Sequence, residues 1–251
     1  MTLPAPSRIV TLLTDFGVSD PFVGIMKGVL LRDAPELQLI DVTHAVPPQD
    51  VALAEFWLAE SYRWFAPGTV HLCVVDPGVG SDRAALAAYA DGHYFVAPDN
   101  GVLGAALQAD AAAEVRRIDL GKLGIAPRSN TFHGRDVFAP VAALLASGKA
   151  SLRELGEAWR AAVRERVPPK RAPDELVGRV VAVDHFGNLI TDLPAKWLQG
   201  GFVRVEASGR TLEIVATYSE AEVGECVALV SSFETLEIAV RNGNAAVALG
   251  L

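Results

Sequence analysis

The stretch "GTVHLCVVDPGVGSDR", residues 68–83, decides the fold, because an apolar run ends abruptly in polar and turn-forming residues. Its first half is apolar at successive positions, as in a strand covered on both faces. Such strands occur in mostly parallel sheets with helices on either side. We therefore predict a buried parallel strand, followed by a loop that carries Asp76 and Arg83 at the strand's carboxyl end.

The sequence around this strand alternates short β-rich runs with longer helical ones. Residues 8–16 and 38–44 are typical of strands, whereas 20–35 and 50–65 have apolar residues at helical spacing. An Asp-Gly pair at 91–92 divides two strand-like halves and indicates a β-hairpin. A helix is expected over 137–148, ending at Gly148. These elements together predict a layered α/β domain with a mostly parallel sheet.

The pattern changes after residue 165. Prolines and charges crowd residues 164–176, where no periodicity survives, so we place a linker at 166–174. From 175 to 251 the chain consists of short β runs with turns between them, and we interpret residues 245–251 as the last of these. We predict an α/β domain over 1–165 and a small antiparallel β domain, a barrel or sandwich, over 175–251.

Composition restricts the classes of partner. The chain has 251 residues, with 22 basic and 30 acidic side chains and a formal charge of −8. This balance argues against non-specific binding to nucleic acid or to an anionic membrane. We see no signal peptide and no apolar run long enough to cross a bilayer, so a cytoplasmic location is expected. Cys73 and Cys226 lie in apolar runs, and we interpret them as buried free thiols.

Polar residues gather where the predicted strands end. Asp15 follows the first strand, Asp76 and Arg83 follow the third, Asp99 follows the hairpin, and His133 precedes a helix. In open α/β sheets, ligands bind beyond the carboxyl ends of the strands, so these residues predict a ligand site. Each also has a simpler explanation as a turn, a helix cap or a loop-closing ion pair. Asp15, Asp76, Asp99 and His133 are too scattered to indicate a metal site, and we predict none.

Seven motifs, taken together and in order, resemble one family. The chain is similar, from about residue 8 to 248, to the S-adenosyl-L-methionine (SAM) hydroxide adenosyltransferases, which are SAM hydrolases related to fluorinase and chlorinase. The motifs that carry the resemblance are "LLTDFGVSDPFVGIMKGV" (12–29), "IDVTH" (40–44), "VVDPGVGSDR" (74–83), "APDNGVL" (97–103), "SNTFHGRDVFAPVAA" (129–143), "DHFGNLITD" (184–192) and "LEIAVRNGNAA" (236–246).

The resemblance implies a reaction and an assembly. Water or hydroxide would attack the ribose C5′ of SAM, giving adenosine and L-methionine, with SAM as substrate, water as co-substrate and no cofactor. The family's catalytic set falls on Asp76, Arg83 and His133. The resemblance also implies a homotrimer, with each active site between the first domain of one subunit and the second domain of its neighbour.

The resemblance further assigns residues that would bind the substrate. Asp15 would accept hydrogen bonds from the ribose hydroxyls, and Phe186 would pack on the adenine. Asp184, Asn188 and Ser232 would hold the methionine amine and carboxylate, while Asn244 and Ala245 would read the adenine edge. The family often has asparagine in place of Ser231 and a glycine-aromatic pair in place of Glu234-Thr235, so the methionine contacts depart from its pattern.

Three other functions were weighed against SAM hydrolysis. A SAM-dependent halogenase on the same scaffold would lack the Asp–Arg–His set and would place Trp and Ser where this chain has Gln49 and Gly134. A non-catalytic adenosine or SAM binder would not need Asp76, Arg83 and His133. A metal-dependent hydrolase would be sensitive to chelators. The sequence therefore predicts a SAM hydrolase; the resemblance also suggests that the biologically inactive sulfonium epimer is its substrate.

Overall fold

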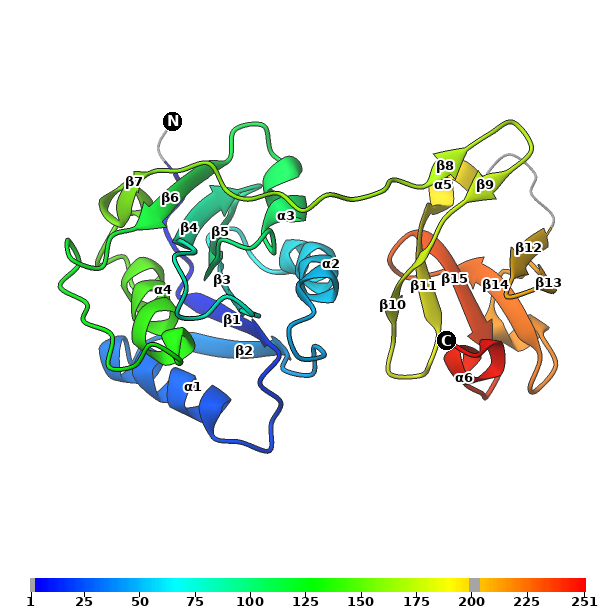
Figure 1. Cartoon of the computed structure of the whole chain (residues 1–251), viewed down its shortest axis with the longest axis horizontal. Coiled ribbons are helices and arrows are strands. Elements are labelled where there is room, and N and C mark those ends of the chain that lie inside the picture. The colour runs from blue at the N-terminus through cyan, green and yellow to red at the C-terminus, as the bar shows by residue number, and fades with distance from the viewer. Residues whose placement is uncertain (1–2, 199–203) are drawn as a thin grey trace. The chain divides into compact units, whose positions relative to one another are not determined.

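The chain forms two compact units, Met1–Glu165 and Arg166–Leu251. The structure, a computed structural model, describes residues 3–198 and 204–251. Figure 1 shows both units with their helices and strands labelled. Each unit has its own sheet.

The first unit is built on a seven-stranded sheet with the order β2-β1-β3-β5-β4-β6-β7. Strands β2, β1, β3, β5 and β6 run in one direction, and β4 and β7 run in the other, so the prediction of a mostly parallel sheet is confirmed. The predicted hairpin is β4 and β5. The strand bounds are β1 (Ile9–Thr14), β2 (Gln38–Thr43), β3 (Val70–Val74), β4 (Ala85–Ala90), β5 (His93–Pro98), β6 (Glu114–Ile118) and β7 (Gly156–Ala158).

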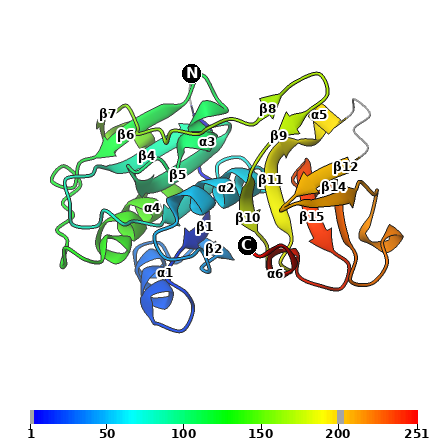
Figure 2. The same cartoon turned by 45° about the vertical axis from the view of Figure 1, so that its right-hand side comes forward.

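Helices cover both faces of this sheet, as Figures 1 and 2 show. Helices α1 and α4 pack together on one face, while α2 and α3 lie on the other. Among the described residues, no helix combines the length and apolarity needed to cross a membrane. The helices are α1 (Phe22–Asp33), α2 (Val51–Ser61), α3 (Gly104–Gln108) and α4 (Ala139–Ala146), with the 3-10 helices η1 (Tyr62–Trp64) and η3 (Leu152–Glu154) and the π-helix η2 (Gly134–Phe138).

Strand β3 is buried along its whole length because its two faces enter different cores. Leu72 and Val74 pack in the core that contains α1 and α4. Cys73 and Val75 pack in the core that contains α2. The apolar run from Val70 to Val75 thus reflects burial on both faces of the sheet. Cys73 is a buried free thiol, as predicted, whereas Cys226 in the second unit is only half-buried.

Strand register brings the predicted polar residues to one edge of the sheet. Strands β1 and β3 are parallel neighbours, and Thr14 pairs with Val74. Asp15 and Asp76 therefore emerge within two positions of this pair, at the carboxyl ends of adjacent strands. Strand β5 is also parallel to β3, so Asp99 follows it at the same edge.

The second unit is an antiparallel β domain, which confirms the other half of the predicted fold class. Its main sheet has the order β10-β11-β15-β14, beside two separate strand pairs. In one of these pairs, β8 lies inside the predicted linker, 166–174, and β9 follows directly after it. The elements are β8 (Lys170–Arg171), β9 (Leu176–Val177), β10 (Val180–Val183), β11 (Leu189–Pro194), α5 (Ala195–Leu198), β12 (Arg204–Ala207), β13 (Arg210–Glu213), η4 (Tyr218–Glu220), β14 (Cys226–Val230), β15 (Thr235–Val240) and α6 (Ala245–Leu249).

The prediction of a strand over residues 245–251 is wrong, because this segment forms helix α6. The Asn244 side chain accepts a hydrogen bond from the Val247 amide and caps the start of the helix. Gly250 ends it in the left-handed conformation, at φ 72°. Caps at both ends outweigh the strand-like run of small apolar residues, which is too short for its periodicity to distinguish helix from strand.

Substitutions at two glycines of the first unit test the pairing of β6 with β7. A Cβ on Gly156, where β7 pairs with Ile118 of β6, would overlap the carbonyl oxygen of Arg117. A Cβ on exposed Gly28 in α1 would meet nothing within 4 Å. We expect Gly156→Ala to cost about 2 kcal/mol or more of unfolding free energy. Gly28→Ala should be neutral or stabilise by up to about 1 kcal/mol, since alanine favours helix. Urea denaturation of both variants measures this; equal stabilities would contradict the β6–β7 pairing.

Candidate active site

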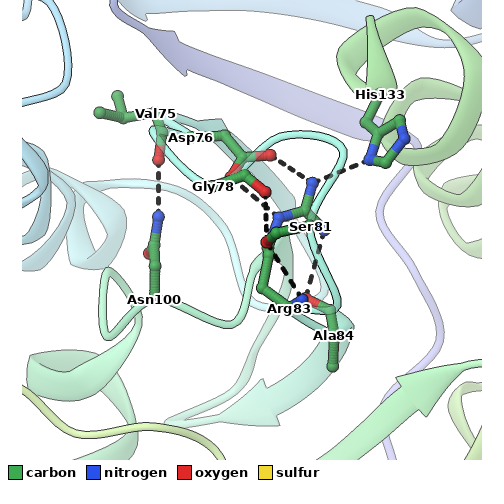
Figure 3. A network of polar contacts seen from close by, with 8 residues as sticks. All are labelled: Val75, Asp76, Gly78, Ser81, Arg83, Ala84, Asn100 and His133. Carbon is green, nitrogen blue, oxygen red and sulfur yellow. Dashed lines mark hydrogen bonds and ion pairs between the residues drawn. The ribbon is translucent and has the colours of Figure 1, made fainter. Parts of the chain in front are cut away.

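The loop between β3 and β4, residues 76–83, folds back so that its first and last residues form an ion pair. Arg83 Nε donates to Asp76 Oδ1 at 2.8 Å, and Arg83 Nη2 donates to Asp76 Oδ2. We call this two-bond pair the Asp76–Arg83 fork; Figure 3 shows it from close by. The side chains are only 5% and 10% exposed. The fork is therefore a largely desolvated, bidentate carboxylate–guanidinium pair.

Small residues let the 76–83 loop fold this tightly. Gly80 has φ 81°, in the left-handed region, and a Cβ there would come within 2.9 Å of the Asn130 carbonyl oxygen. The Ser81 hydroxyl donates to the Gly78 carbonyl at 2.7 Å and closes the turn. The sequence "DPGVGSDR" thus brings Asp76 and Arg83 together through its glycines and serine.

His133 completes the group from a different part of the chain. Arg83 Nη2 lies 2.9 Å from His133 Nδ1. A guanidinium can only donate, so Nδ1 accepts this hydrogen bond and the proton of the neutral ring sits on Nε2. Burial lowers the pKa of His133, and the positive charge of Arg83 lowers it further. The imidazole is therefore neutral at pH 7 and presents Nε2–H as a donor.

The segment that carries His133 is held by a neighbouring carboxylate. Asp136 is 7% exposed, and its Oδ2 accepts hydrogen bonds from the Arg128 and Ser129 amides at 3.2 and 3.0 Å. Arg135 also binds Asp136 through Nε at 2.7 Å and lowers the pKa of that carboxyl group. Asp136 thus fixes the loop before the π-helix η2, at whose start His133 lies.

Asp15 lies at the same sheet edge but does not join the fork. Its Oδ2 accepts a hydrogen bond from the Gln49 amide at 2.8 Å. Gln49 has φ 69°, an unfavourable left-handed conformation for a residue with a side chain. Behind this contact, the buried Thr14 hydroxyl and His44 Nδ1 lie 2.8 Å apart. The carboxylate of Asp15 is thus held by a strained backbone turn, while its other oxygen accepts no hydrogen bond from the described residues.

Aromatic rings form a wall beside His133. Phe16, Phe22 and Phe132 meet edge to face, with centroids 5.3 to 6.0 Å apart. A Cβ on Gly134 would approach Met26 Sδ at 3.0 Å and the rings of Phe16 and Phe132 at 3.3 Å. The wall therefore fits closely around a residue without a side chain at position 134.

In the second unit, three of the predicted substrate-binding residues form one turn. Asp184 Oδ1 accepts from the amides of Phe186 and Asn188, and Asp184 Oδ2 accepts from Asn188 Nδ2 at 2.9 Å. The ring of Phe186 is 72% exposed. The Asp184 carboxylate orders this turn and leaves the Phe186 ring open to a ligand.

The remaining predicted residues lie at the start of α6 and on the turn between β14 and β15. Asn244 packs against it, since a Cβ on Gly187 would overlap the Asn244 side chain. Buried Ala245 follows in helix α6. Ser232 lies exposed on the turn between β14 and β15, and no described hydrogen bond joins it to Asp184. The structure thus gathers the 184–188 turn and the start of α6, and Ser232 lies on a different turn.

Sequence reasoning missed a buried carboxylate in this unit. Glu237 on β15 is 4% exposed, and its Oε1 accepts a hydrogen bond from the Tyr218 hydroxyl at 2.7 Å. Burial raises the pKa of Glu237, the Tyr218 bond opposes this, and the charge of Asp184 raises it further. The signal was present in "LEIAV", where one acidic residue interrupts an apolar strand.

The four residues weighed as metal ligands do not form one cluster. The carboxylate of Asp99 is occupied by Trp159 Nε1 at 2.8 Å and by the Ala162 amide at 2.7 Å. Nowhere in the part of the chain that the structure describes do three or more His, Cys, Asp or Glu side chains form a group suited to a metal ion.

Comparisons with known proteins agree on one family. The family model described as "SAM hydroxide adenosyltransferase N-terminal domain" matches residues 10–156, and its C-terminal counterpart matches 178–251. An (R)-S-adenosyl-L-methionine hydrolase of Thermus thermophilus is 40% identical, over 97% of this chain and 96% of the relative. A fluorinase of Nocardia brasiliensis is 28% identical, over 92% of this chain and 89% of the fluorinase.

A solved structure has the same fold. An uncharacterized conserved protein from Thermotoga maritima aligns with a TM-score of 0.90 and 35% identity, over 96% of both chains. The two family-model matches together span most of the 251 residues. The predicted family resemblance is therefore confirmed: this chain belongs to the SAM hydroxide adenosyltransferase family.

Proposed function

We propose that this protein hydrolyses SAM to adenosine and L-methionine, with the Asp76–Arg83 fork and His133 as its catalytic group. The observation that carries the proposal is the bond between Arg83 Nη2 and His133 Nδ1 beside a buried bidentate fork. This joins an acid, a fixed positive charge and an imidazole at the ligand-binding edge of the sheet. Curated relatives at about 40% identity, named as (R)-SAM hydrolases, support the same reaction.

The chemistry requires help for the nucleophile and not for the leaving group. A water oxygen forms a bond to the ribose C5′ while the C5′–S bond breaks. The electron pair of the C5′–S bond goes to sulfur. The positively charged sulfonium becomes a neutral thioether, so methionine leaves without a general acid. Water, whose pKa is about 15.7, is the weak partner. The site must therefore orient it and receive the proton that it loses.

The three side chains divide this task according to their hydrogen bonds. Arg83 is permanently charged and stabilises negative charge that develops on the attacking oxygen. His133 uses Nδ1 to bind Arg83, so it offers Nε2–H to orient the water. Asp76 has the remaining lone pairs, and we assign it as the proton acceptor.

The substrate's other groups would be held by both units. We assign Asp15, with one carboxylate oxygen free of described donors, to the ribose hydroxyls. Phe186 offers an exposed ring to the adenine, and Asn244 with Ala245 lies against the same turn. Asp184 and Asn188, with Ser232, would bind the amino-acid end of SAM.

We further propose a homotrimer in which neighbouring subunits build each site. Apolar side chains are exposed beside the proposed ligand edge of the first unit, with Val18 85% and Phe22 43% exposed. The second unit exposes Phe186 and Val247, 72% and 77%. A protein seldom leaves such residues in water beside a binding site, and a neighbouring copy would cover them.

A halogenase is the alternative on this scaffold, and two observations disfavour it. The fluorinase relatives are only 25–28% identical to this chain, below the hydrolases. Gly134, where halogenating relatives would carry serine, has aromatic neighbours within 3.3 Å of a Cβ. A non-catalytic SAM binder differs in another way, because it would release no product.

Isotopic labelling tests the reaction directly. In water enriched in oxygen-18, turnover of SAM should place the label in the 5′-hydroxyl of adenosine, because the attacking oxygen comes from solvent. Mass spectrometry of the product measures this, with protein omitted as the control. Adenosine without label, a 5′-halogenated nucleoside in the presence of halide, or no product would each reject SAM hydrolysis by water attack.

The role of Arg83 is tested by two substitutions. Arg83→Ala should lower kcat by about 10²-fold, by analogy with loss of an oxyanion donor. Arg83→Lys keeps the charge but cannot form the fork, so it should recover only part of the loss. Adenosine release measured by chromatography gives the rates. An unchanged kcat in a folded Arg83→Ala protein would show that Arg83 is only structural.

Subunit mixing tests the shared site. If Asp15 and Asp184 act from different subunits, inactive Asp15→Ala and Asp184→Ala proteins should regain activity when they are refolded together. Random 1:1 mixing of a cyclic trimer leaves one intact site in three-quarters of the trimers, so about a quarter of wild-type activity should return. Each variant refolded alone is the control. Absence of any recovery would place the site within one chain.

A further inference from the structure

The turn after β5, Asp99–Asn100, bonds to the residue on each side of the 76–83 loop. Asn100 Nδ2 donates to the carbonyl oxygen of Val75, directly before Asp76, at 2.8 Å. The Asp99 amide donates to the carbonyl oxygen of Ala84, directly after Arg83, at 2.9 Å. Figure 3 shows the Asn100 contact beside the fork. One turn thus holds both ends of the loop that carries Asp76 and Arg83.

These contacts matter because a bidentate fork tolerates little displacement. Arg83 Nη1 also donates to the Ala84 carbonyl, at 3.3 Å, so the carbonyl that Asp99 holds is in direct contact with the guanidinium. On the other side, Val75 is fully buried, and its peptide plane leads directly into Asp76. A shift at either end would move one partner of the fork relative to the other.

The turn is itself fixed from its outer side. The Asp99 carboxylate accepts from Trp159 Nε1 at 2.8 Å and from the Ala162 amide at 2.7 Å. The Trp159 ring is stacked below the Arg117 guanidinium, 5.0 Å from its centroid. Asn100 Oδ1 accepts from the Val102 amide at 3.2 Å and sets the side chain's orientation. The turn is therefore a rigid support between the segment after β7 and the 76–83 loop.

We infer that Asn100, together with Asp99, is a positioning residue that sets the Asp76–Arg83 fork and, through Arg83, the hydrogen bond to His133. Neither residue belongs to the predicted catalytic or substrate-binding set. Asn100 is the better residue to substitute, because its Nδ2 makes one side-chain hydrogen bond, to the carbonyl oxygen of Val75 directly before the loop. The inference concerns geometry, and only its kinetic consequence rests on the proposed function.

Asn100→Asp removes the donor and keeps the side chain's size. Its oxygen would still accept from the Val102 amide, but the other oxygen would face the Val75 carbonyl without a proton to donate. We expect kcat for SAM to fall by about 10²-fold, as for a small misplacement of catalytic groups, with KM changed less than about threefold. Asn100→Ser, whose shorter hydroxyl can form the same turn but cannot reach Val75, is the second variant and should show the same loss.

Asp110→Asn is the matched control. The Asp110 side chain, like that of Asn100, makes two hydrogen bonds with the backbone. It accepts both, from the Asp91 and Ala112 amides at 2.9 and 2.8 Å, and it lies at the opposite end of the β4–β5 hairpin. It should change stability by an amount similar to that of Asn100→Asp and leave kcat unchanged. A similar fall in kcat in both variants would show a general effect of stability and would overturn the inference.

A spectroscopic measurement separates this inference from the proposed function. The chain has five histidines, so a sample labelled with nitrogen-15 histidine gives a simple spectrum. The resonances of His133 are the ones missing from the spectrum of the His133→Asn variant. Wild-type protein at pH 7 should show a protonated Nε2 and an acceptor Nδ1, and Asn100→Asp or Asn100→Ser should shift the Nδ1 resonance. Asp110→Asn should not. Unchanged His133 resonances in both folded Asn100 variants would overturn the inference, whether or not the wild-type protein hydrolyses SAM.

Discussion

The Asp76–Arg83 fork is the central interaction of the candidate active site. Both charged side chains are almost completely removed from water, which costs several kcal/mol per ion unless geometry and further hydrogen bonds compensate. Here the compensation comes from two bonds within the fork, from the Ala84 carbonyl and from the face of the Phe138 ring, 5.1 Å from the guanidinium. A buried ion pair often adds little to the stability of the folded protein. Its position at the proposed ligand edge of the sheet therefore favours a catalytic role.

The fork also determines the state of His133. Because Arg83 can only donate, its contact selects the imidazole tautomer with the proton on Nε2. Burial, together with the charge of Arg83, lowers the pKa of His133 and keeps the ring neutral. The arrangement differs from a Ser-His-Asp relay, in which the acid binds the imidazole directly. Here a guanidinium separates the carboxylate from the imidazole, so the three groups can surround a water molecule with a donor, a positive charge and an acceptor.

The two units present different kinds of polar and aromatic group. The first unit supplies charge and rigid loops at the ends of parallel strands, where a carboxylate such as Asp15 meets a strained turn at Gln49. The second unit supplies an ordered turn at Asp184 and an exposed ring at Phe186. Glu237 is buried and accepts a hydrogen bond from the Tyr218 hydroxyl, so this unit contains a second carboxylate whose oxygen is engaged. In the proposed complex, carboxylates would face the cationic groups of SAM, and the exposed Phe186 ring would face its purine.

The sequence by itself determined the fold class, the family and the loop that carries Asp76 and Arg83, because apolar runs and motif order are local properties of the chain. The sequence pattern predicted a strand over residues 245–251, because a run of seven apolar and small residues is too short to distinguish a helix from a strand. The structure shows a helix there, capped by Asn244 and Gly250. Only the tertiary structure placed His133, 50 residues from Arg83, against the guanidinium, and only it gave Asn100 and Asp99 a part in holding the loop. Those contacts join segments that are distant in the chain, and their distances depend on how the strands align and how the helices pack against them.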